Sequence, residues 1–533
     1  MPFSRAFRGL SLPLIAVSAV AVLLKCASPI LQRHLIDGAI NGNGMAALVA
    51  GSVFASMLVL TFGLGILIRW LDGLLAIRVR QRLKGELFKH LLALPEEFLK
   101  SKGAGYFFNR VQSDSNEVCL FLMGNGVFIW TELLKLATAM AVVVHVDWRF
   151  AVLTLPFLAM QIAICGKFRK RQYALSSEIQ EVIATERHLM QEYLSRHSIV
   201  KTHSAADVAG ERVDKGLKRW GGLFRSRLVN ENWFRMFLQL PVWACKGTVL
   251  FIGFYRISHG DMTIGALWEL IALLGLLFAP TKAIGGIFVQ MQSALAAKGR
   301  LDELWGEQVE ESGGSADDDL GGDIVFSHLS FRYADGKPLL EDVSFTVKAG
   351  TLVFLTGPNG CGKSTLMSLM LRLYRPQSGS ITIGGRNIKD FPLKPYRSGI
   401  GYIGQNPEFI KGTLRDNMLI GNQLRSDDEI MAAGRMAGCT ALLEARGLDG
   451  AVEENAENFS GGEKLRLALL RELLRDTEIL LFDEPAAHLD PESRKAFYAL
   501  VKGLAGRKTI VAVVHHLPDG VDAPVVSLPH NAT

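Results

Sequence analysis

A short stretch between an apolar segment and a predicted helix, Gly357 to Thr365, constrains this chain more than any other feature. It follows a predicted strand, Leu352 to Thr356, and a glycine-rich loop that runs from a strand into a helix presents N–H groups without intrahelical partners. Glycines let the backbone curl around a phosphate, Lys363 can reach the terminal phosphates, and the Ser364 hydroxyl can hold Mg²⁺. A glycine-rich turn without nucleotide is the alternative, which the spacing Gly-x4-Gly-Lys-Ser disfavours. The sequence therefore predicts a nucleoside triphosphate site made by Gly357, Pro358, Asn359, Gly360, Cys361, Gly362, Lys363, Ser364 and Thr365.

Apolar residues are unevenly distributed over the 533 residues, a length too great for one ordinary domain. Roughly the first 300 residues carry long apolar runs, whereas the remainder alternates like a soluble α/β domain. The formal net charge of +6 is modest for this length and does not indicate a nucleic-acid partner. Six cysteines lie far apart without a CxxC pair, which argues against a disulfide framework or a zinc site. We therefore expect a membrane part followed by a soluble part.

Six apolar stretches are long enough to cross a hydrocarbon core, which takes about 20 residues. The first follows Arg5 and Arg8 like a secretory signal, but no convincing cleavage site follows it, so we interpret it as a retained membrane helix. An even number of crossings leaves both ends of the membrane part on one side, as required if the phosphate loop is to meet cytoplasmic ATP. The predicted spans are Leu10 to Leu31, Met45 to Ile68, Val118 to Val146, Trp148 to Gly166, Met236 to Ile257 and Ile264 to Met291.

Lysine and arginine are concentrated in the long segments after the second and fourth spans. The opposite connections, Asp37 to Gly44, His145 to Asp147 and Ser258 to Thr263, contain neither residue. By the positive-inside rule the N-terminus, both long segments and the C-terminal domain are cytoplasmic. Helical periodicity continues through the long segments, so we expect helices that project into the cytoplasm. Their tips, near Gly103 to Gly105 and near Ser204 to Val208, are predicted to contact a cytoplasmic domain.

An acidic, glycine-rich stretch after the last span indicates a linker, and short strands alternating with helices follow it. This order predicts a multidomain chain: an all-α six-helix transmembrane domain at 1–305, a linker at 306–323, and an α/β P-loop ATPase domain at 324–533 with a parallel core and an added antiparallel edge. The expected strands are Ile324 to Phe326, Val343 to Val347, Leu352 to Thr356, Ile381 to Ile383, Ile479 to Phe482 and Thr509 to Val514.

Two carboxylates, Asp483 and Glu484, end the apolar strand that begins at Ile479. A buried strand would deliver Asp483 beside the phosphate loop to hold the Mg²⁺ shell, and Glu484 would face the attacking water. An acidic pair at a strand end is weak evidence alone, but it is strong evidence downstream of a phosphate loop. The sequence therefore predicts ATP hydrolysis.

A second predicted anion site is formed by Ser460, Gly461, Gly462 and Glu463, ahead of the helix Lys464 to Arg475. Ser460 as N-cap with Glu463 three residues on forms a capping box, so a well-started helix is the simpler interpretation. Paired glycines at the positive end of that helix also suit a γ-phosphate. Because Lys363 already serves the first site, we expect this second site to address nucleotide on another copy of the protein.

Together these motifs resemble the ATP-binding cassette transporters, specifically an exporter-type half-transporter with its membrane domain fused ahead of the nucleotide-binding domain. The resemblance covers nearly the whole chain, and Ser460 to Glu463 matches the family signature usually written LSGGQ. It implies that Tyr333 stacks on adenine, that Gln405 is the lid glutamine that reaches Mg²⁺, and that His515 is the switch histidine that contacts γ-phosphate. Asp490 fits the loop that crosses between two cassettes.

The resemblance extends to the membrane half of the chain. The sequence also differs from the family pattern at some positions. Leu87 to Pro95 with Arg110 and Asp114 is similar to the family's first cytoplasmic loop. The chain ends soon after His515, so the nucleotide domain is expected to be short at its C-terminus, and His516 stands where an arginine is common. No predicted catalytic group is missing, which argues against a cassette that does not hydrolyse ATP.

Placing an ionisable residue inside a membrane span costs free energy, so each such residue is a candidate for a functional role. Glu132 and Lys135 are one helical turn apart and are expected to neutralise each other. Arg69 and Asp72 are expected at the cytoplasmic edge of the membrane. Three residues have no local partner: Lys25, Lys246 and Glu269. Either at least one of them lines a polar translocation cavity, or they are accounted for by pairing between helices or by burial at the end of a span.

The sequence as a whole predicts ATP-driven export or flipping of an amphipathic or charged substrate such as a peptide, lipid or drug. The expected partners are a second copy or a similar half-transporter, membrane lipid and the substrate, with ATP and Mg²⁺ bound at two composite sites. A bacterial inner membrane with the ATPase domain in the cytoplasm is the expected location. An ATP-gated channel or a membrane sensor that uses the same cassette without pumping is the alternative.

Overall fold

The structure is a computed structural model that describes residues 3–121, 126–311, 320–333, 336–421, 425–486, 489–518 and 522–529. It divides into two compact units. The first comprises Met1–Leu92 and Ala104–Glu307, and the second comprises Ala93–Gly103 and Gln308–Thr533. The tip of the first long segment therefore packs with the C-terminal part of the chain.

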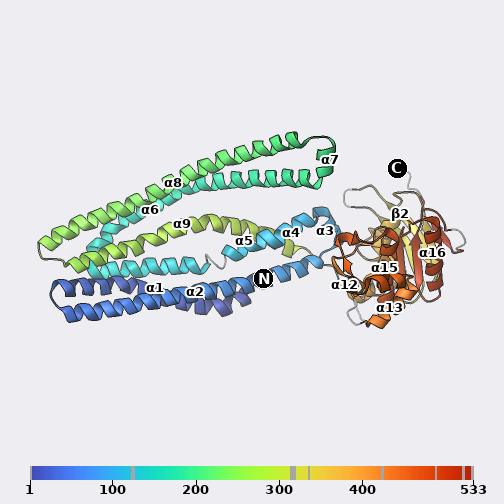
Figure 1. The fold of residues 1–533 in the computed structure, drawn as a ribbon, viewed down its shortest axis with the longest axis horizontal. Coiled ribbons are helices and arrows are strands. Elements are labelled where there is room, and N and C mark those ends of the chain that lie inside the picture. The colour runs from blue at the N-terminus through green and yellow to red at the C-terminus, as the bar shows by residue number, and fades with distance from the viewer. Residues whose placement is uncertain are drawn as a thin grey trace. The chain divides into compact units, whose positions relative to one another are not determined.

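The first unit is built from long helices that run nearly side by side (Figure 1). Its elements are α1 (Phe3–Ile40), α2 (Gly44–Leu92), α4 (Ala104–Asn109), the π-helix η1 (Arg110–Asp114), α5 (Ser115–Leu120), α6 (Gly126–Ser195), α7 (His197–Thr202), α8 (Ala206–Ser258) and α9 (Ile264–Gly306). Among the described residues, five of these helices, α1, α2, α6, α8 and α9, are long and apolar enough to cross a membrane. Large apolar side chains on them face outward, since Val59 is 73% exposed and Phe251 is 77% exposed. Such surfaces are stable against lipid or another chain.

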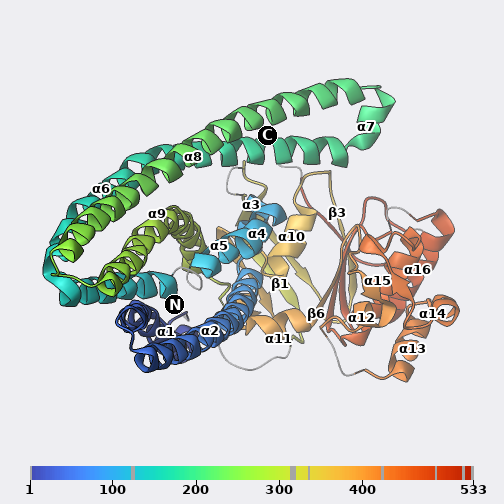
Figure 2. The same cartoon turned by 60° about the vertical axis from the view of Figure 1, so that its left-hand side comes forward.

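The predicted spans Val118 to Val146 and Trp148 to Gly166 meet at a break in α6 at Asp147 (φ −165°, ψ 113°). The first of them begins in α5 and includes residues 122–125, which lie outside the described residues. The Asp147 carboxylate accepts a hydrogen bond from the N–H of Arg149 at 2.9 Å and pairs with Arg256 of α8. Figure 2 shows the two halves of α6 meeting at a sharp turn. The predicted connection at His145 to Asp147 is therefore reduced to one non-helical residue, Asp147. This is sufficient because Asp147 is extended and its side chain caps the first turn of the helix that follows.

The interior of the first unit is apolar with a few polar ties. The buried cluster joins α1, α6, α8 and α9, with Ala139, Cys245 and Leu273 fully buried. Lys135 pairs with Glu132 at 2.5 Å, as predicted. Glu269 is 2% exposed and pairs with Arg33 of α1 at 3.4 Å, so the prediction is resolved in favour of pairing between helices.

The second unit contains two main sheets, one parallel and one antiparallel. We predicted that the antiparallel strands would extend an edge of the parallel sheet, but they form a sheet of their own. The parallel sheet has the order β11-β3-β10-β9-β6, and the antiparallel sheet has the order β2-β1-β4-β5. Among the described residues the two sheets share no strand: β1 lies between β2 and β4 in the antiparallel sheet, and the parallel sheet contains none of these strands. The strands are β1 (Ile324–Phe331), β2 (Leu340–Val347), β3 (Leu352–Thr356), β4 (Ser378–Ile383), β5 (Arg386–Asn387), β6 (Ile400–Ile403), β7 (Gly412–Thr413), β8 (Ala451–Val452), β9 (Ile479–Asp483), β10 (Thr509–Val513) and β11 (Val525–Ser527).

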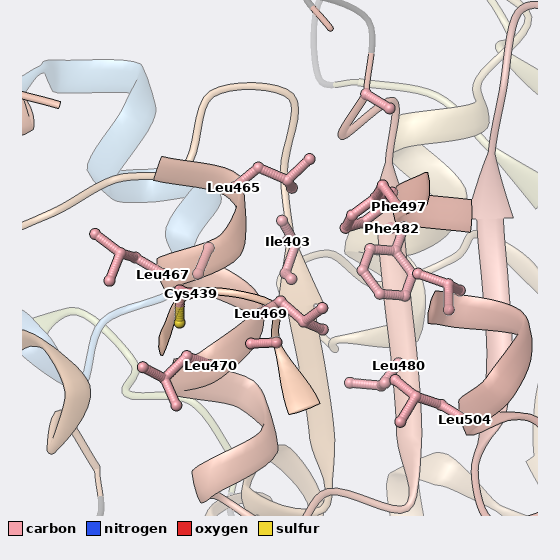
Figure 3. Close-up of a cluster of buried hydrophobic side chains, with 14 of the residues drawn as sticks. Ile403, Cys439, Leu465, Leu467, Leu469, Leu470, Leu480, Phe482, Phe497 and Leu504 are labelled. Atoms are coloured by element: carbon pink, nitrogen blue, oxygen red, sulfur yellow. The ribbon is translucent and has the colours of Figure 1, made fainter. Parts of the chain in front are cut away.

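Helices cover both faces of the parallel sheet, and alternation along its strands divides the core in two. Phe354 and Phe482 point into the cluster under α15, whereas Leu355 and Leu481 point into the cluster under α10. Figure 3 shows the first cluster, in which leucines of α15 face Ile403, Leu480 and Phe482. The helices of this unit are α3 (Glu96–Lys102), α10 (Lys363–Met370), η3 (Ile388–Asp390), α11 (Leu393–Ser398), α12 (Leu414–Met418), α13 (Asp427–Met436), α14 (Thr440–Arg446), η4 (Glu454–Ala456), α15 (Gly461–Leu474) and α16 (Pro491–Leu504). The phosphate-loop helix and the signature helix therefore lie on opposite faces of one sheet.

Within the predicted linker, Gly306 and Glu307 belong to the first unit, and Gln308 to Glu311 belong to the second. Glu310 accepts two hydrogen bonds from the guanidinium of Arg397, at 2.7 and 2.8 Å, and its N–H donates to the carbonyl of Ala93 at 2.9 Å. Glu311 pairs with Arg375 at 3.2 Å. The bidentate pair of Arg397 with Glu310 fixes the orientation of the two side chains as well as their distance. Residues 312–319 of the predicted linker lie outside the described residues.

Candidate active site

The loop between β3 and α10 has the backbone conformation that its glycines permit. Gly360 (φ 80°) and Gly362 (φ 98°) lie in the left-handed region, which residues with a Cβ rarely adopt. A Cβ on Gly362 would also lie 2.6 Å from a methyl carbon of Leu340. Larger side chains at these two positions would therefore distort the loop.

Lys363 begins α10, and its ammonium is held over the loop. Its Nζ donates to the carbonyl of Gly357 at 2.7 Å and to that of Pro358 at 2.9 Å. The residue is 6% exposed. A buried cation at the positive end of a helix makes this loop a strong site for an anion with several phosphates.

Ser364 and Asp483 bring two oxygen ligands together. The Ser364 hydroxyl donates to Asp483 Oδ1 at 3.0 Å, across 119 residues of sequence. Burial raises the pKa of Asp483, and the hydrogen bond from Ser364 opposes that shift. A hydroxyl and one carboxylate fit Mg²⁺, which keeps water and phosphate oxygens as its other ligands. The described residues contain no cluster of three or more His, Cys, Asp or Glu side chains able to hold a metal, so a protein-only metal cage is not present among them.

Tyr402 of β6 also contacts Asp483 and was not predicted as a site residue. Its hydroxyl donates to Asp483 Oδ2 at 3.4 Å, and burial, with the nearby Asp483 charge, raises the pKa of Tyr402 to about 12. Tyr402 therefore remains a neutral donor at physiological pH. Its position in β6, three residues before Gln405, is the sequence signal that we overlooked.

Glu484 and His515 come together beyond the ends of β9 and β10. Nε2 of His515 lies 2.8 Å from Oε2 of Glu484. The two strands pair in parallel with Asp483 opposite Val513, so both ends fall at one edge of the sheet. Glu484 has φ 50°, a conformation that non-glycine residues adopt at a cost of roughly 1–3 kcal/mol and that clusters at functional sites. The carboxylate has the geometry of a general base oriented by a histidine.

Tyr333 lies beside the phosphate-loop helix within a group of aromatic rings. Its hydroxyl is 2.9 Å from Thr365 Oγ1, and its ring is edge-on to Tyr374 with centroids 5.3 Å apart. Tyr333 remains 39% exposed, so ring surface is available for a planar base. Tyr374 in turn lies under the ammonium of Lys100 of α3, 5.9 Å from the ring centroid. Sequence inspection did not single out Tyr374.

Ser460 caps α15 with the capping box that the sequence indicates. Its hydroxyl accepts from the N–H of Glu463, and the Glu463 carboxylate accepts from the N–H of Ser460 at 2.8 Å. Donation to the Glu463 carboxylate from the N–H of Ser460, and from its hydroxyl, lowers the pKa of Glu463. Gly461 and Gly462 form the first turn on the face of the sheet opposite α10. The structure therefore does not bring this motif to Lys363 of the same chain.

Two further predicted residues stand apart from the phosphate loop. Gln405 is exposed, and within the described part of the chain it makes no hydrogen bond with Ser364 or Asp483. Asp490 is the N-cap of α16, where it accepts from the N–H of Ser493 at 2.9 Å. Ala487 and His488, next to it, lie outside the described residues.

Comparison with known proteins gives two family matches, one for each part of the chain. Residues 12–281 match the family model described as the ABC transporter transmembrane region, and residues 340–487 match the model described as ABC transporter. The first match alone covers half of the chain. The second includes the phosphate loop, the signature motif and Glu484.

The alignments with similar proteins span both parts of this chain. An "ATP-dependent lipid A-core flippase" of Burkholderia pseudomallei is 26% identical over 94% of this chain and 85% of that relative. A "Multidrug resistance ABC transporter ATP-binding and permease protein" of Lactococcus lactis subsp. cremoris is 26% identical over 96% and 86%. Among solved structures, "Structure of a bacterial Atm1-family ABC exporter with ATP bound" aligns with a TM-score of 0.83 at 21% identity, over 98% of this chain and 94% of that one. The likeness to the solved structure establishes the fold.

Proposed function

The chain belongs to the ABC transporter family, and on that premise we propose that it exports or flips an amphipathic or charged substrate across a membrane by means of ATP hydrolysis. It is a multi-pass membrane protein with an ATPase coupled to transport. One observation carries the proposal: the Glu484–His515 pair stands at the sheet edge beside Asp483 and Ser364, in a chain that also carries the membrane helices.

Each residue of the site has a defined task in this proposal. Lys363 and the N–H groups of α10 bind the phosphates, and Ser364 with Asp483 would hold Mg²⁺, which neutralises charge on the transferred phosphoryl group. Glu484 accepts the proton of the attacking water, and His515 orients that carboxylate. Tyr333 offers its ring to the base. Gln405 is proposed to join the metal ligands when the lid that carries it moves.

We further propose that two chains form a dimer with two composite ATP sites. The placement of α10 and α15 on opposite faces of the sheet supports this, because one chain cannot present both motifs to one nucleotide. A C₂ arrangement would place Ser460 to Glu463 of each protomer opposite Lys363 of the other. A second, similar half-transporter could take the partner's place.

The substrate class rests on the relatives, whose names include a lipid A-core flippase and a multidrug resistance transporter. An amphiphile, whether lipid, peptide or drug, is the cargo we propose, and the bacterial inner membrane is the proposed location. A channel or sensor that uses the same cassette differs from a pump because it does not move substrate against a concentration gradient. In inverted vesicles a pump accumulates substrate against a gradient with ATP, whereas a channel only equilibrates it.

Replacement of Glu484 by Gln tests the catalytic assignment. The amide cannot accept the water proton, so we expect ATP hydrolysis to fall roughly 10²- to 10⁴-fold while ATP binding is retained. Glu444→Gln, an exposed carboxylate on α14, is the matched control and should hydrolyse ATP like the wild type. Hydrolysis at the wild-type rate by Glu484→Gln would remove Glu484 from the mechanism.

A further inference from the structure

A cavity of about 640 Å³ in the membrane unit contains an unusual concentration of positive charge. Three helices form its walls, α1, α2 and α6, and α1 packs against each of the other two. Its lining is Ser18, Ala21, Val22 and Lys25 of α1, Leu58, Thr61, Phe62, Gly65, Ile68 and Arg69 of α2, and Phe128, Thr131 and Lys135 of α6. Three of these side chains are cations and none is an anion.

The cations are not balanced within the cavity. Lys135 pairs with Glu132, which is buried behind it. In the described part of the chain, Lys25 and Arg69 form no ion pair, and both are exposed. Asp72, one turn beyond Arg69, does not line the cavity. Lys25, an uncompensated cation inside a membrane span, is costly unless an anion accompanies it.

The cations are spread along the depth of the membrane. At 1.5 Å per residue, Lys25 lies roughly 20 Å from the end of α1 at Ile40, and Lys135 lies roughly 20 Å from the break at Asp147. Figure 1 shows both of these turns at the same end of the helical unit. Arg69 lies roughly 35–40 Å from the start of α2 at Gly44, beyond a hydrocarbon core of about 30 Å. The cavity therefore extends from mid-membrane to the opposite surface.

The two deep cations lie at one level. Cys26 Sγ of α1 is 3.1 Å from Thr138 Oγ1 of α6, so the helices touch one residue after Lys25 and one turn after Lys135. The ammonium of Lys135 also lies 5.8 Å from the ring centroid of Phe128. Val22, Phe62 and Ile68 supply apolar wall between the deep cations and Arg69. The cavity thus has cations at mid-membrane depth, apolar side chains along its length, and Arg69 at the membrane surface. This arrangement suits an amphiphile with an acidic headgroup.

We propose that this cavity binds an anionic membrane phospholipid such as phosphatidylglycerol, with the phosphate on the cations of Arg69 or of Lys25 and Lys135 and the acyl chains along Phe62 and Ile68. Lysine and arginine both bind phosphate through charge-assisted hydrogen bonds. The inference concerns binding alone and goes beyond the proposed transport function, so either can fail without the other.

Lipid carried through purification tests the proposal. The full chain is placed in nanodiscs of equal phosphatidylglycerol and phosphatidylcholine, extracted in detergent, and its retained lipids are counted by mass spectrometry. Wild type should retain the anionic lipid preferentially. The double variant Lys25→Gln/Arg69→Gln should lose roughly tenfold or more of that preference, because each lost charge-assisted hydrogen bond to phosphate is worth about that factor.

Lys246→Gln is the matched control, because it removes one cation from the membrane span of α8, which does not line the cavity. Lys135 is left unchanged, since its loss would leave the buried carboxylate of Glu132 unpaired and unfold the site for another reason. Equal retention of anionic lipid by wild type and the double variant, or equal loss in Lys246→Gln, would overturn the proposal.

A photoreactive benzophenone side chain at position 62 identifies the occupant directly, and it does not depend on the charge variants. Phe62 lines the cavity and is 69% exposed. An adduct with phosphatidylglycerol supports lipid binding. A cross-link to a second protomer in its place would show that a second copy of the chain covers this face, and would overturn the proposal.

Discussion

At the scale of single residues, the site depends on oxygen atoms brought together from distant positions. Asp483 receives hydrogen bonds from Ser364 and Tyr402, which belong to α10 and β6. Helix α10 packs on β9 and β6 pairs with it, so the sheet fixes the three side chains at one edge. A rigid sheet edge of this kind holds catalytic groups more firmly than a loop does.

Asp483→Asn tests this residue as a metal ligand. The amide retains the size of the side chain but loses the charge, so the Mg²⁺ concentration for half-maximal hydrolysis should rise roughly tenfold or more. Asp476→Asn is the control, because Asp476 precedes the same strand, is 88% exposed in its side chain, and has φ 54°, which asparagine tolerates. An unchanged Mg²⁺ requirement in Asp483→Asn would contradict the assignment.

Glu463 predicts a pH dependence at the start of α15. Its pKa is lowered because the N–H of Ser460 donates to its carboxylate. The stabilisation is therefore present above the unfolded-state pKa, about 4.3, and is lost as the pH falls through the lower folded-state pKa. Hydrogen exchange in the first turn of α15, corrected for its intrinsic pH dependence, should accelerate in acid.

In Glu463→Gln the amide oxygen can still accept from Ser460 but does not titrate, so the same first turn should show no acid-dependent loss of protection. Acceleration of equal size in both proteins would show that another group is responsible.

At the scale of elements, α1 and α9 are joined at their ends by a polar clasp. Asp37 accepts from the hydroxyl of Thr263 at 2.8 Å and from the N–H of Gly265 at 2.9 Å. A Cβ on Gly265 would lie 2.5 Å from Asp37 Oδ1, so only glycine allows this approach. Arg33 lies four residues before Asp37 in α1, and Glu269 lies four residues after Gly265 in α9. These two side chains form the second polar contact between the helices. The start of α9 is thus capped both by Thr263, which accepts from the N–H of Ala266, and by Asp37 of another helix.

Asp37→Ala should destabilise the membrane unit by about 1–2 kcal/mol, the usual cost of removing a helix cap. The expected observation is a lower Tm of the full chain in nanodiscs. Asp261→Ala removes a neighbouring exposed carboxylate and should leave the Tm unchanged. Equal effects of the two substitutions would indicate a general charge effect in place of the clasp.

At the scale of the whole molecule, the decisive question is whether two chains share each ATP site. Because α10 and α15 lie on opposite faces of the sheet, the proposed dimer predicts that substitutions in the phosphate loop and in the signature motif of one chain impair different ATP sites. Subunit mixing can therefore separate a composite site from a site made within one chain.

Co-expression of Lys363→Ala with Ser460→Arg should restore ATP occlusion that neither variant shows alone. In the mixed dimer, both lesions fall in one composite site and the other site is intact. The measurement is retention of labelled ATP by purified, differently tagged mixed dimers. The same mixture of chains kept as separate homodimers is the control, and failure of mixed dimers to retain nucleotide would contradict shared sites.

The sequence alone determined the features that depend on short-range chemistry. The spacing Gly-x4-Gly-Lys-Ser imposes left-handed glycines and a helix start at Lys363, and Ser460 with Glu463 imposes a capping box, because each of these motifs closes its hydrogen bonds within a few residues. Apolar length likewise indicated the membrane helices, and the strand from Ile479 placed Asp483 at its end.

Only the tertiary structure decided the features that depend on pairing between distant segments. It placed the antiparallel strands in a sheet of their own, joined Glu269 to Arg33, brought Tyr402 to Asp483, and gathered Lys25, Arg69 and Lys135 around one cavity. No local pattern encodes these contacts, because helix and sheet periodicities state which face of an element is apolar but not which other element covers it. The phosphate loop could be identified from nine residues, whereas its surroundings depended on the whole fold.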